Sequence, residues 1–264
     1  MQSEKQYIDL YTEAQQLIKE HAAPVLNEVR DKAFEDFRRQ GFPTKKVERY
    51  KYTDMQKLFE PDYGLNLNRL EIPVNPYETF KCDVPNLSTS LYFVVNDQFY
   101  SKALPKAKLN DGVIVDSLKR VATERPELVA KYYGRLANTE ADAITALNTM
   151  LAQDGLFIYV PKNVQLERTI QVINILRSDV DLMVNRRVLI VLEEGAKAQF
   201  LFCDHAADDR NFLATQVIEA YVGANANLEL NCLEETHAKN VRVSNVYIEQ
   251  QRDSRASHNV ITLH

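Results

Sequence analysis

The segment CDHAADDR gathers the densest set of side chains that can do chemistry, namely Cys203, His205, Asp208 and Asp209. A thiol, an imidazole and two carboxylates at this spacing can ligate a metal ion or form an acid–base pair. A solvated turn between two strands is the competing interpretation. We favour the turn, because aspartate is common in turns and no helix holds these side chains on one face.

A second group, NCLEETHAKN, contains Cys232, Glu234, Glu235 and His237. The same alternatives apply to this group. We again favour a turn, with Cys232 as a small buried hydrophobic residue.

Two basic doublets, Arg186-Arg187 and Lys45-Lys46, are candidates for gripping an anion. Each lies among acidic neighbours, so a solvated face is the favoured interpretation. His258 lies in an alternating strand, where an exposed or hydrogen-bonded histidine is commoner than a ligand. The residues therefore assign no catalytic group and no metal ligand, and they leave cofactor binding unknown.

The cysteines Cys82, Cys203 and Cys232 are odd in number and lack C-x-x-C spacing, which indicates neither a disulfide framework nor a zinc site. Neither G-x-x-x-x-G-K-S/T nor G-x-G-x-x-G occurs, which excludes those two nucleotide-binding loops. The 264 residues are 45% hydrophobic and carry a net charge of −5 with both signs mixed, so no nucleic-acid or membrane-binding patch is indicated. With a polar first segment and no long apolar run, we expect a cytoplasmic protein.

Residues 1–60 are predicted to form an N-terminal helical hairpin. The second helix has the apolar face Leu26, Val29, Ala33 and Phe37, and Gly41 supplies a left-handed stop. Thr53 and Gln56 have capping-box spacing and predict a short helix.

Residues 61–153 form a mixed α+β segment. Asn96-Asp97 is a turn dipeptide between β-rich runs, and GVIVDSL is a third strand, which together predict a small sheet. Helices are expected again within 116–136 and 139–155, the second ended by Gly155.

Residues 154–264 contain short apolar runs at regular intervals and no helix that could cross between parallel strands. An antiparallel sandwich or jelly roll and a parallel β-helix both fit this pattern. Pro161, Gly195 and Gly223 stand 34 and 28 positions apart in similar surroundings. Such a repeat favours a right-handed parallel β-helix, because stacked coils present equivalent positions to one another.

Alternation along the strands separates the interior from the exterior of this β-helix. Counted from Gly195 and Gly223, four side chains share the inward offsets: Phe200, Phe202, Leu228 and Leu230. By the same count Cys203 and Cys232 point to opposite faces, which makes them poor candidates for a shared metal.

Two stretches resemble a known family. GFPTKKVERYKYTDM resembles the N-terminal signature of SufD-type iron-sulfur cluster assembly proteins, with Tyr50 in place of the usual tryptophan, and ALNTMLAQDGLFIYVPKNVQLERTIQV is similar to the start of the β-helix in the SufB/SufD family. The resemblance covers nearly the whole chain. It implies a scaffold subunit without catalysis, which pairs with a SufB-like subunit and engages a SufC-like ABC ATPase. An iron-sulfur cluster or flavin is then expected only in the assembled complex.

In that family the ATPase contact lies in a C-terminal helical domain, and an interface histidine lies late in the β-helix. We expect this chain to be a fragment that lacks both, and we equate neither His258 nor His264 with that histidine. The last coil is then expected to be covered by further coils, by another subunit or by a homodimer contact through the β-helix ends or edges.

Two other functions compete with the scaffold. A polysaccharide-active enzyme on a β-helix needs carboxylates along one groove, and Asp179, Asp181, Glu193 and Glu219 do not share one offset from the repeat turns. A jelly-roll binding module would require antiparallel strands.

Overall fold

The computed structural model describes residues 2–76, 89–102, 104, 109, 112–235 and 238–263. The N-terminal helices are α1 (Gln2–Glu20), α2 (Pro24–Asn27), α3 (Arg30–Gln40), η1 (Glu48–Tyr50) and α4 (Met55–Phe59). A second helical group comprises α6 (Leu118–Glu124), α7 (Pro126–Ala130) and α8 (Ala143–Leu151). No helix follows α8 in the described part of the chain, as the sequence predicts.

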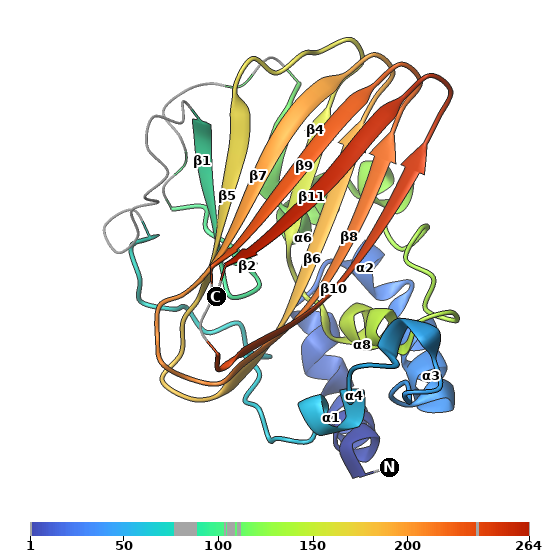
Figure 1. Ribbon diagram of the computed structural model, residues 1–264, viewed down its shortest axis with the longest axis vertical. Coiled ribbons are helices and arrows are strands. Elements are labelled where there is room, and N and C mark those ends of the chain that lie inside the picture. Colours follow the sequence, from blue (N-terminus) through green and yellow to red (C-terminus); the bar gives the residue numbers. More distant parts are fainter. Residues whose placement is uncertain are drawn as a thin grey trace.

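The strands after α8 form a parallel β-solenoid of about four coils (Figure 1). They are β4 (Leu156–Val160), β5 (Thr169–Leu176), β6 (Leu182–Leu192), β7 (Lys197–Ala206), β8 (Phe212–Val222), β9 (Asn227–Glu235), β10 (Asn240–Gln250) and β11 (Arg255–Leu263). Successive strands alternate between two sheets, and each pairs in parallel with the equivalent strand of the next coil. The predicted parallel β-helix is confirmed, and the alternative prediction of an antiparallel sandwich or jelly roll is wrong.

The turn that follows each strand of the β4–β6–β8–β10 sheet repeats a left-handed residue. Asn163, Gly195, Asn225 and Asp253 all have φ between 58° and 69°. The counterpart of Gly195 is therefore Asn225, so the expected equivalence of Pro161, Gly195 and Gly223 is wrong. Asparagine and aspartate adopt this backbone conformation more readily than other non-glycine residues, which hides the repeat from a search for glycine alone.

Glycine is required at position 223 for a different reason, which is the close approach of two coils. A Cβ atom there would lie 2.7 Å from the backbone nitrogen of Glu194 in the preceding turn. A side chain at position 223 would therefore push two coils apart.

The inward and outward faces are as predicted, although the register is displaced by two residues. Phe200 lies beside Leu230, and Leu228 lies beside Ala198. All of these side chains are buried in the interior core together with Phe202. An even displacement leaves every side chain on its own face, which is why the prediction survives the error.

The two cysteines also lie on opposite faces, as expected. Cys232 belongs to the interior core, whereas Cys203 packs in a separate outer cluster with Phe93 and Ile173.

The strands before α6 extend the solenoid. β1 (Thr89–Val95) and β2 (Gln98–Phe99) form the predicted hairpin around Asn96-Asp97, and β3 (Ile114–Ser117) follows. However, β1 pairs in parallel with β5, and β3 pairs antiparallel with β4. The expected small sheet is thus the first layer of both solenoid sheets.

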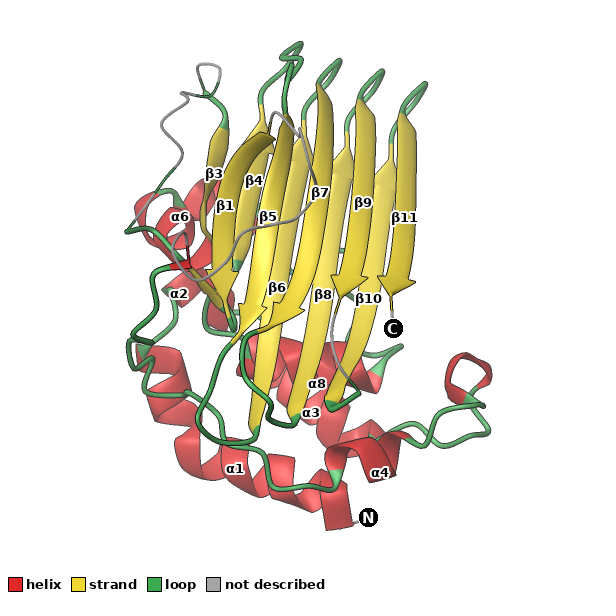
Figure 2. Cartoon of the chain, turned by 60° about the vertical axis from the view of Figure 1, so that its left-hand side comes forward, coloured by secondary structure: helices red, strands yellow, loops and turns green. Residues whose placement is uncertain are grey.

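The helices pack at one end and along the outer face of the β4–β6–β8–β10 sheet (Figure 2). α1 and α3 form the predicted hairpin, in which Tyr11 and Phe34 stack with ring centroids 4.5 Å apart. Gly41 ends α3 with φ 61°. The cap of α4 is Asp54 and not Thr53, since the Asp54 carboxylate accepts a hydrogen bond from the Lys57 backbone N–H at 3.2 Å.

Gly155 does not end α8, which stops at Leu151. It precedes β4, where an added Cβ atom would lie 2.0 Å from the carbonyl oxygen of Arg187 in the next coil. Gly155 therefore allows the first coil to sit directly against β6.

We predict that Gly155→Ala lowers the free energy of unfolding by about 3 kcal/mol, because the backbone of β6 cannot move away from the added methyl group. Urea unfolding followed by circular dichroism measures the change. Gly64→Ala is the control, since its Cβ meets its nearest atom at an ordinary 3.4 Å. Equal losses in the two variants would contradict the steric explanation.

Candidate functional site

A layer of polar side chains crosses the interior of the solenoid. It lies between the large interior core, which includes Val188 and Phe202, and a smaller apolar cluster, which includes Val184 and Ala206. The members of this polar layer are Arg186, Asp204, Gln216, Glu234 and Arg242. Gln216 donates a hydrogen bond to the exposed Ser244 at 3.1 Å. The layer is the densest group of charges inside the described solenoid.

Ion pairs connect the charged members of the polar layer. Asp204 accepts hydrogen bonds from both arginines, from Arg186 on one carboxylate oxygen and from Arg242 on the other, the latter at 2.5 Å. Arg242 also pairs with Glu234. Arg186 further donates through Nε to the carbonyl oxygen of Asn96 at 2.9 Å.

Register explains why these groups meet. β7 pairs with β9 so that Asp204 lies beside Glu234, one coil apart. Two carboxylates stacked in this way repel each other unless a cation neutralises them, and Arg242 contacts both. The two sequence groups around Cys203 and Cys232 are therefore brought together.

The doublet Arg186-Arg187 is not a solvated face, so that expectation is wrong. The exposed fractions of the two residues are 2% and 1%. They point to opposite sides of β6, and each meets a carboxylate from a later strand. Lys45-Lys46 is exposed, as expected.

Arg187 and Glu219 form the second buried ion pair, on the outer face of β6 and β8. The Arg187 guanidinium donates to Glu219 at 2.6 Å and lies over the ring of Tyr133, 4.8 Å from its centroid. Glu219 also accepts backbone hydrogen bonds from Gly134, Leu136 and Ala137 at 2.9–3.0 Å. This carboxylate therefore holds the connection between α7 and α8 against the solenoid.

Cys232, which is buried in β9, and His258, which is exposed on β11, are neighbours in the last two coils, with Sγ and Nε2 3.7 Å apart. Burial raises the pKa of the Cys232 thiol to about 11. Burial, followed by the charge of Arg242, lowers the pKa of His258. At neutral pH the pair is a thiol beside a neutral imidazole, which is a poor metal ligand set until the thiol loses its proton.

The remaining candidate residues from the sequence do not form a common site. Asp208 lies in a turn and accepts from the Ser178 backbone N–H at 2.8 Å, and Asp209 pairs with Lys239, so the turn interpretation is right for both. The turn interpretation is wrong for Cys203 and His205, which are buried in β7, and for Glu234 and Glu235, which lie in β9. His205 Nδ1 lies 3.8 Å from a Glu235 carboxylate oxygen, and burial lowers the pKa of His205. Within the described residues, no three His, Cys, Asp or Glu side chains are arranged to hold a metal ion. Cys82, His237 and His264 lie outside the described residues.

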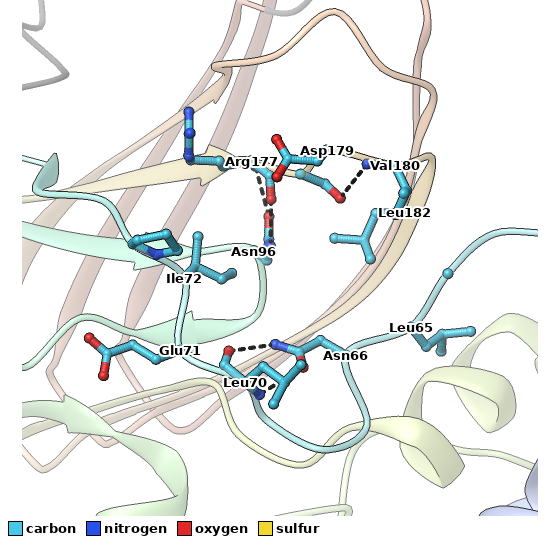
Figure 3. Close-up of a pocket in the computed structure, with 13 residues that line it drawn as sticks. Leu65, Asn66, Leu70, Glu71, Ile72, Asn96, Arg177, Asp179, Val180 and Leu182 are labelled. Carbon is cyan, nitrogen blue, oxygen red and sulfur yellow. Dashed lines mark hydrogen bonds between the residues drawn. The ribbon is translucent and has the colours of Figure 1, made fainter.

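An apolar cleft of about 300 Å³ lies outside the solenoid, between residues 64–73 and the turn after β5 (Figure 3). Leu70 and Val180 line it and are 68% and 58% exposed. Its walls are held by hydrogen bonds between Asn66 and Leu70 and between Asn96 and Arg177. The lining suits an apolar side chain better than a charged reactant.

Comparison with known proteins matches both parts of the chain to one family. The model described as SufBD protein N-terminal region matches residues 1–172, and the model described as SUF system FeS cluster assembly, SufBD core domain matches residues 174–264. The chain belongs to the SufBD family. The resemblance seen in GFPTKKVERYKYTDM and the segment around Gly155 is therefore confirmed.

Three curated relatives illustrate the similarity. The chain is 32% identical over 131 residues to the chloroplastic SufBD family protein ABCI8 of Arabidopsis thaliana, covering 48% of this chain and 23% of that protein. It is 32% identical over 135 residues to a SufBD family protein of Synechocystis, covering 50% and 28%, and 33% identical over 121 residues to the iron-sulfur cluster assembly protein SufD of Bacillus subtilis, covering 45% and 27%. The chain thus spans about a quarter of the length of these relatives.

The carboxylates that a β-helix polysaccharide enzyme would need are spread over the SufBD fold. Asp181 and Glu193 flank the 11-residue strand β6 and so stand roughly 40 Å apart. Glu219 is fully buried against Arg187. The expectation that these groups do not share a groove agrees with their positions.

Among the described helices, none is long and apolar enough to cross a membrane.

Asp204 and Arg242, two central members of the polar layer, are absent from the candidates that the sequence suggests. Alternation along the strand could have identified Asp204. It lies two and four residues after Phe202 and Phe200 in β7, so its side chain points to the same, inward face. A charged side chain that points inward must have a partner of opposite charge, because an unpaired buried charge is too costly. The sequence therefore predicts that a buried ion pair exists, but not which residue is the partner of Asp204.

We predict that Glu219→Gln lowers the free energy of unfolding by about 3–5 kcal/mol, because the Arg187 charge is left buried without a counter-charge. Chemical denaturation gives the value. Glu194→Gln is the control, because Glu194 pairs with Lys162 where both are exposed, and the expected change is below about 1 kcal/mol. A loss near that of the control would contradict the view that Arg187 needs the Glu219 charge in its buried site.

We also predict slow alkylation of Cys232. At pH 8, a thiol with a pKa of about 11 is ionised about a hundredfold less often than a thiol with the ordinary pKa of 9.0. Because the thiolate is the form that reacts, iodoacetamide should modify Cys232 about a hundredfold more slowly in the folded chain than in urea. Mass spectrometry of a Cys82→Ser, Cys203→Ala variant isolates this site. Equal rates with and without urea would contradict the predicted burial of the thiol.

Proposed function

We propose that this chain belongs to a cytoplasmic scaffold subunit for iron-sulfur cluster assembly, and that it is not itself an enzyme. The observation that carries the proposal is that two models of one assembly family together match nearly the whole chain. The names of the relatives, including the iron-sulfur cluster assembly protein SufD of Bacillus subtilis, support the same proposal.

The chemistry of the described residues supports a scaffold. Each charge of the polar layer has an ion-pair partner within it, and the Arg187–Glu219 pair is taken up in attaching helices. The Cys232 thiol is protonated at neutral pH, so it is a weak nucleophile. We assign no iron-sulfur cluster or flavin to residues of this chain and expect either one only in the assembled complex.

The proposed partners are a SufB-like subunit, bound through the solenoid, and a SufC-like ABC ATPase, which would supply ATP hydrolysis. A homodimer through the β-helix ends or edges is the alternative.

Affinity purification of the full-length protein from its own cells tests this proposal. We expect an ABC-type ATPase and a homologous solenoid subunit to be recovered together, and we expect the purified protein alone to hydrolyse no ATP. Recovery of neither partner would overturn the scaffold proposal.

A further inference from the structure

The apolar cleft outside the solenoid has an exposed aliphatic side chain on each of its two walls. Leu70 lies on the wall formed by residues 64–73, and Val180 lies on the wall formed by the turn after β5. Two further aliphatic residues, Ile72 and Leu182, stand on opposite sides of the space between the walls (Figure 3). Exposed apolar side chains that line one concavity mark a place where another molecule covers them.

The wall formed by residues 64–73 is preformed. The Asn66 side chain accepts a hydrogen bond from the Leu70 backbone N–H at 2.8 Å and donates one to the Leu70 carbonyl oxygen at 2.9 Å. Arg69 has a left-handed backbone with φ 53°, and its guanidinium donates to Asp97 at 2.9 Å. These contacts hold Leu70 in its exposed position.

The opposite wall is fixed to the same frame. The Gly64 backbone N–H donates to the Asp181 carbonyl oxygen at 3.0 Å, and the Met183 N–H donates to the Gly64 carbonyl oxygen at 2.9 Å. Asn96 bonds both backbone groups of Arg177 at 2.9–3.0 Å. A molecule that enters the cleft therefore orders neither wall, which lowers the entropic cost of binding.

The cleft lies at the beginning of the solenoid. Its lining residue Asn96 directly follows β1, and Val180 lies between β5 and β6. In the sheet of these strands the order is β11-β9-β7-β5-β1-β2, so β7 and β9 separate the cleft from β11 (Figure 1). The exposure of Leu70 and Val180 is therefore independent of what covers the last coil.

Charge on the two walls selects the kind of partner that fits. Asp179 is exposed and forms no ion pair with another described residue. Glu71 adds a second carboxylate on the opposite wall, where it pairs with the exposed Lys102. Arg177 is the one cation among the described lining residues, and it donates to Asp208 at 3.3 Å. The charge left uncompensated is negative, so a basic group complements it.

We propose that the cleft is a docking site for a segment of a partner protein in which a leucine-sized side chain is followed by lysine or arginine. The aliphatic side chain enters between Leu70 and Val180, and the cation lies beside Asp179. A space of about 300 Å³ is at the lower limit of ligand pockets, so it accepts one anchoring side chain and not the face of a helix. This surface goes beyond the proposed scaffold role and does not depend on it.

Three tetrapeptides with blocked ends are the probes: acetyl-Gly-Leu-Lys-Gly-amide, its Leu-Glu counterpart and its Ala-Lys counterpart. In the full chain with ¹³C-labelled leucine and valine methyl groups, the signals of Leu70 and Val180 are assigned by their loss in Leu70→Ile and Val180→Ile. We expect both signals to shift saturably with the Leu-Lys peptide. Binding should be about threefold weaker with Leu-Glu, as for the loss of an exposed ion pair, and at least tenfold weaker with Ala-Lys.

The methyl signals of Val260, which is exposed on β11, are the internal control and should not shift. The absence of a saturable shift, equal binding of the three peptides, or an equal shift of Val260 would overturn the proposal. A shift of Leu70 and Val180 that grows with protein concentration in the absence of peptide would also overturn it, because a second copy of the chain would then be the occupant.

Asp179→Lys tests the charge selection. We expect this variant to bind the Leu-Glu peptide more tightly than the Leu-Lys peptide, which reverses the order of the wild type. Asp9→Lys is the matched control, because Asp9 is an exposed aspartate on α1 that does not line the cleft, and it should keep the order of the wild type. An unchanged order in Asp179→Lys, or the same reversal in both variants, would contradict the role given to Asp179.

Discussion

The structure depends on backbone pairing between coils. Each solenoid strand hydrogen-bonds the equivalent strand one coil away, so every side chain lies directly beside its counterpart in the next coil. Columns of like residues result, such as Phe200 beside Leu230. Apolar columns gain from this arrangement, whereas a column of carboxylates such as Asp204 and Glu234 is stable only if a cation reaches both.

Buried charge then defines the register of the coils. Arg186 and Arg187 are adjacent in β6 and face opposite sides, and each finds its own carboxylate. A slip of one residue would turn Arg186 outward and Arg187 into the interior core, leaving both charges buried without their partners. Apolar columns tolerate a slip of two residues far better, since every side chain then stays on its own face and Val, Ile and Leu are interchangeable neighbours. We infer that the two ion-pair systems contribute more to a unique register than to stability.

The sequence predicts those features that depend on the alternation of side chains along a strand or on the residues within a single turn. The fold class, the interior position of Phe200 and the stop at Gly41 are of this kind. It fails where the deciding neighbour lies one coil away. Sequence neighbours alone predict that Arg187 lies on a solvated face. Its ion-pair partner, Glu219, follows 32 positions later in the chain. Gly155 resembles a helix stop for the same reason, since the atom that requires glycine there is the Arg187 carbonyl oxygen in the next coil.

The same neutralisation that permits a polar layer inside the solenoid limits what the layer can do. Both oxygens of Asp204 are engaged by arginines, and Arg242 bridges two carboxylates, so proton transfer at any of these groups would break an ion pair in a buried site. Acid–base catalysis needs a group that gains or loses a proton during the reaction, and these groups are held in one charge state by their partners. The paired layer therefore fixes both the charge and the position of its side chains.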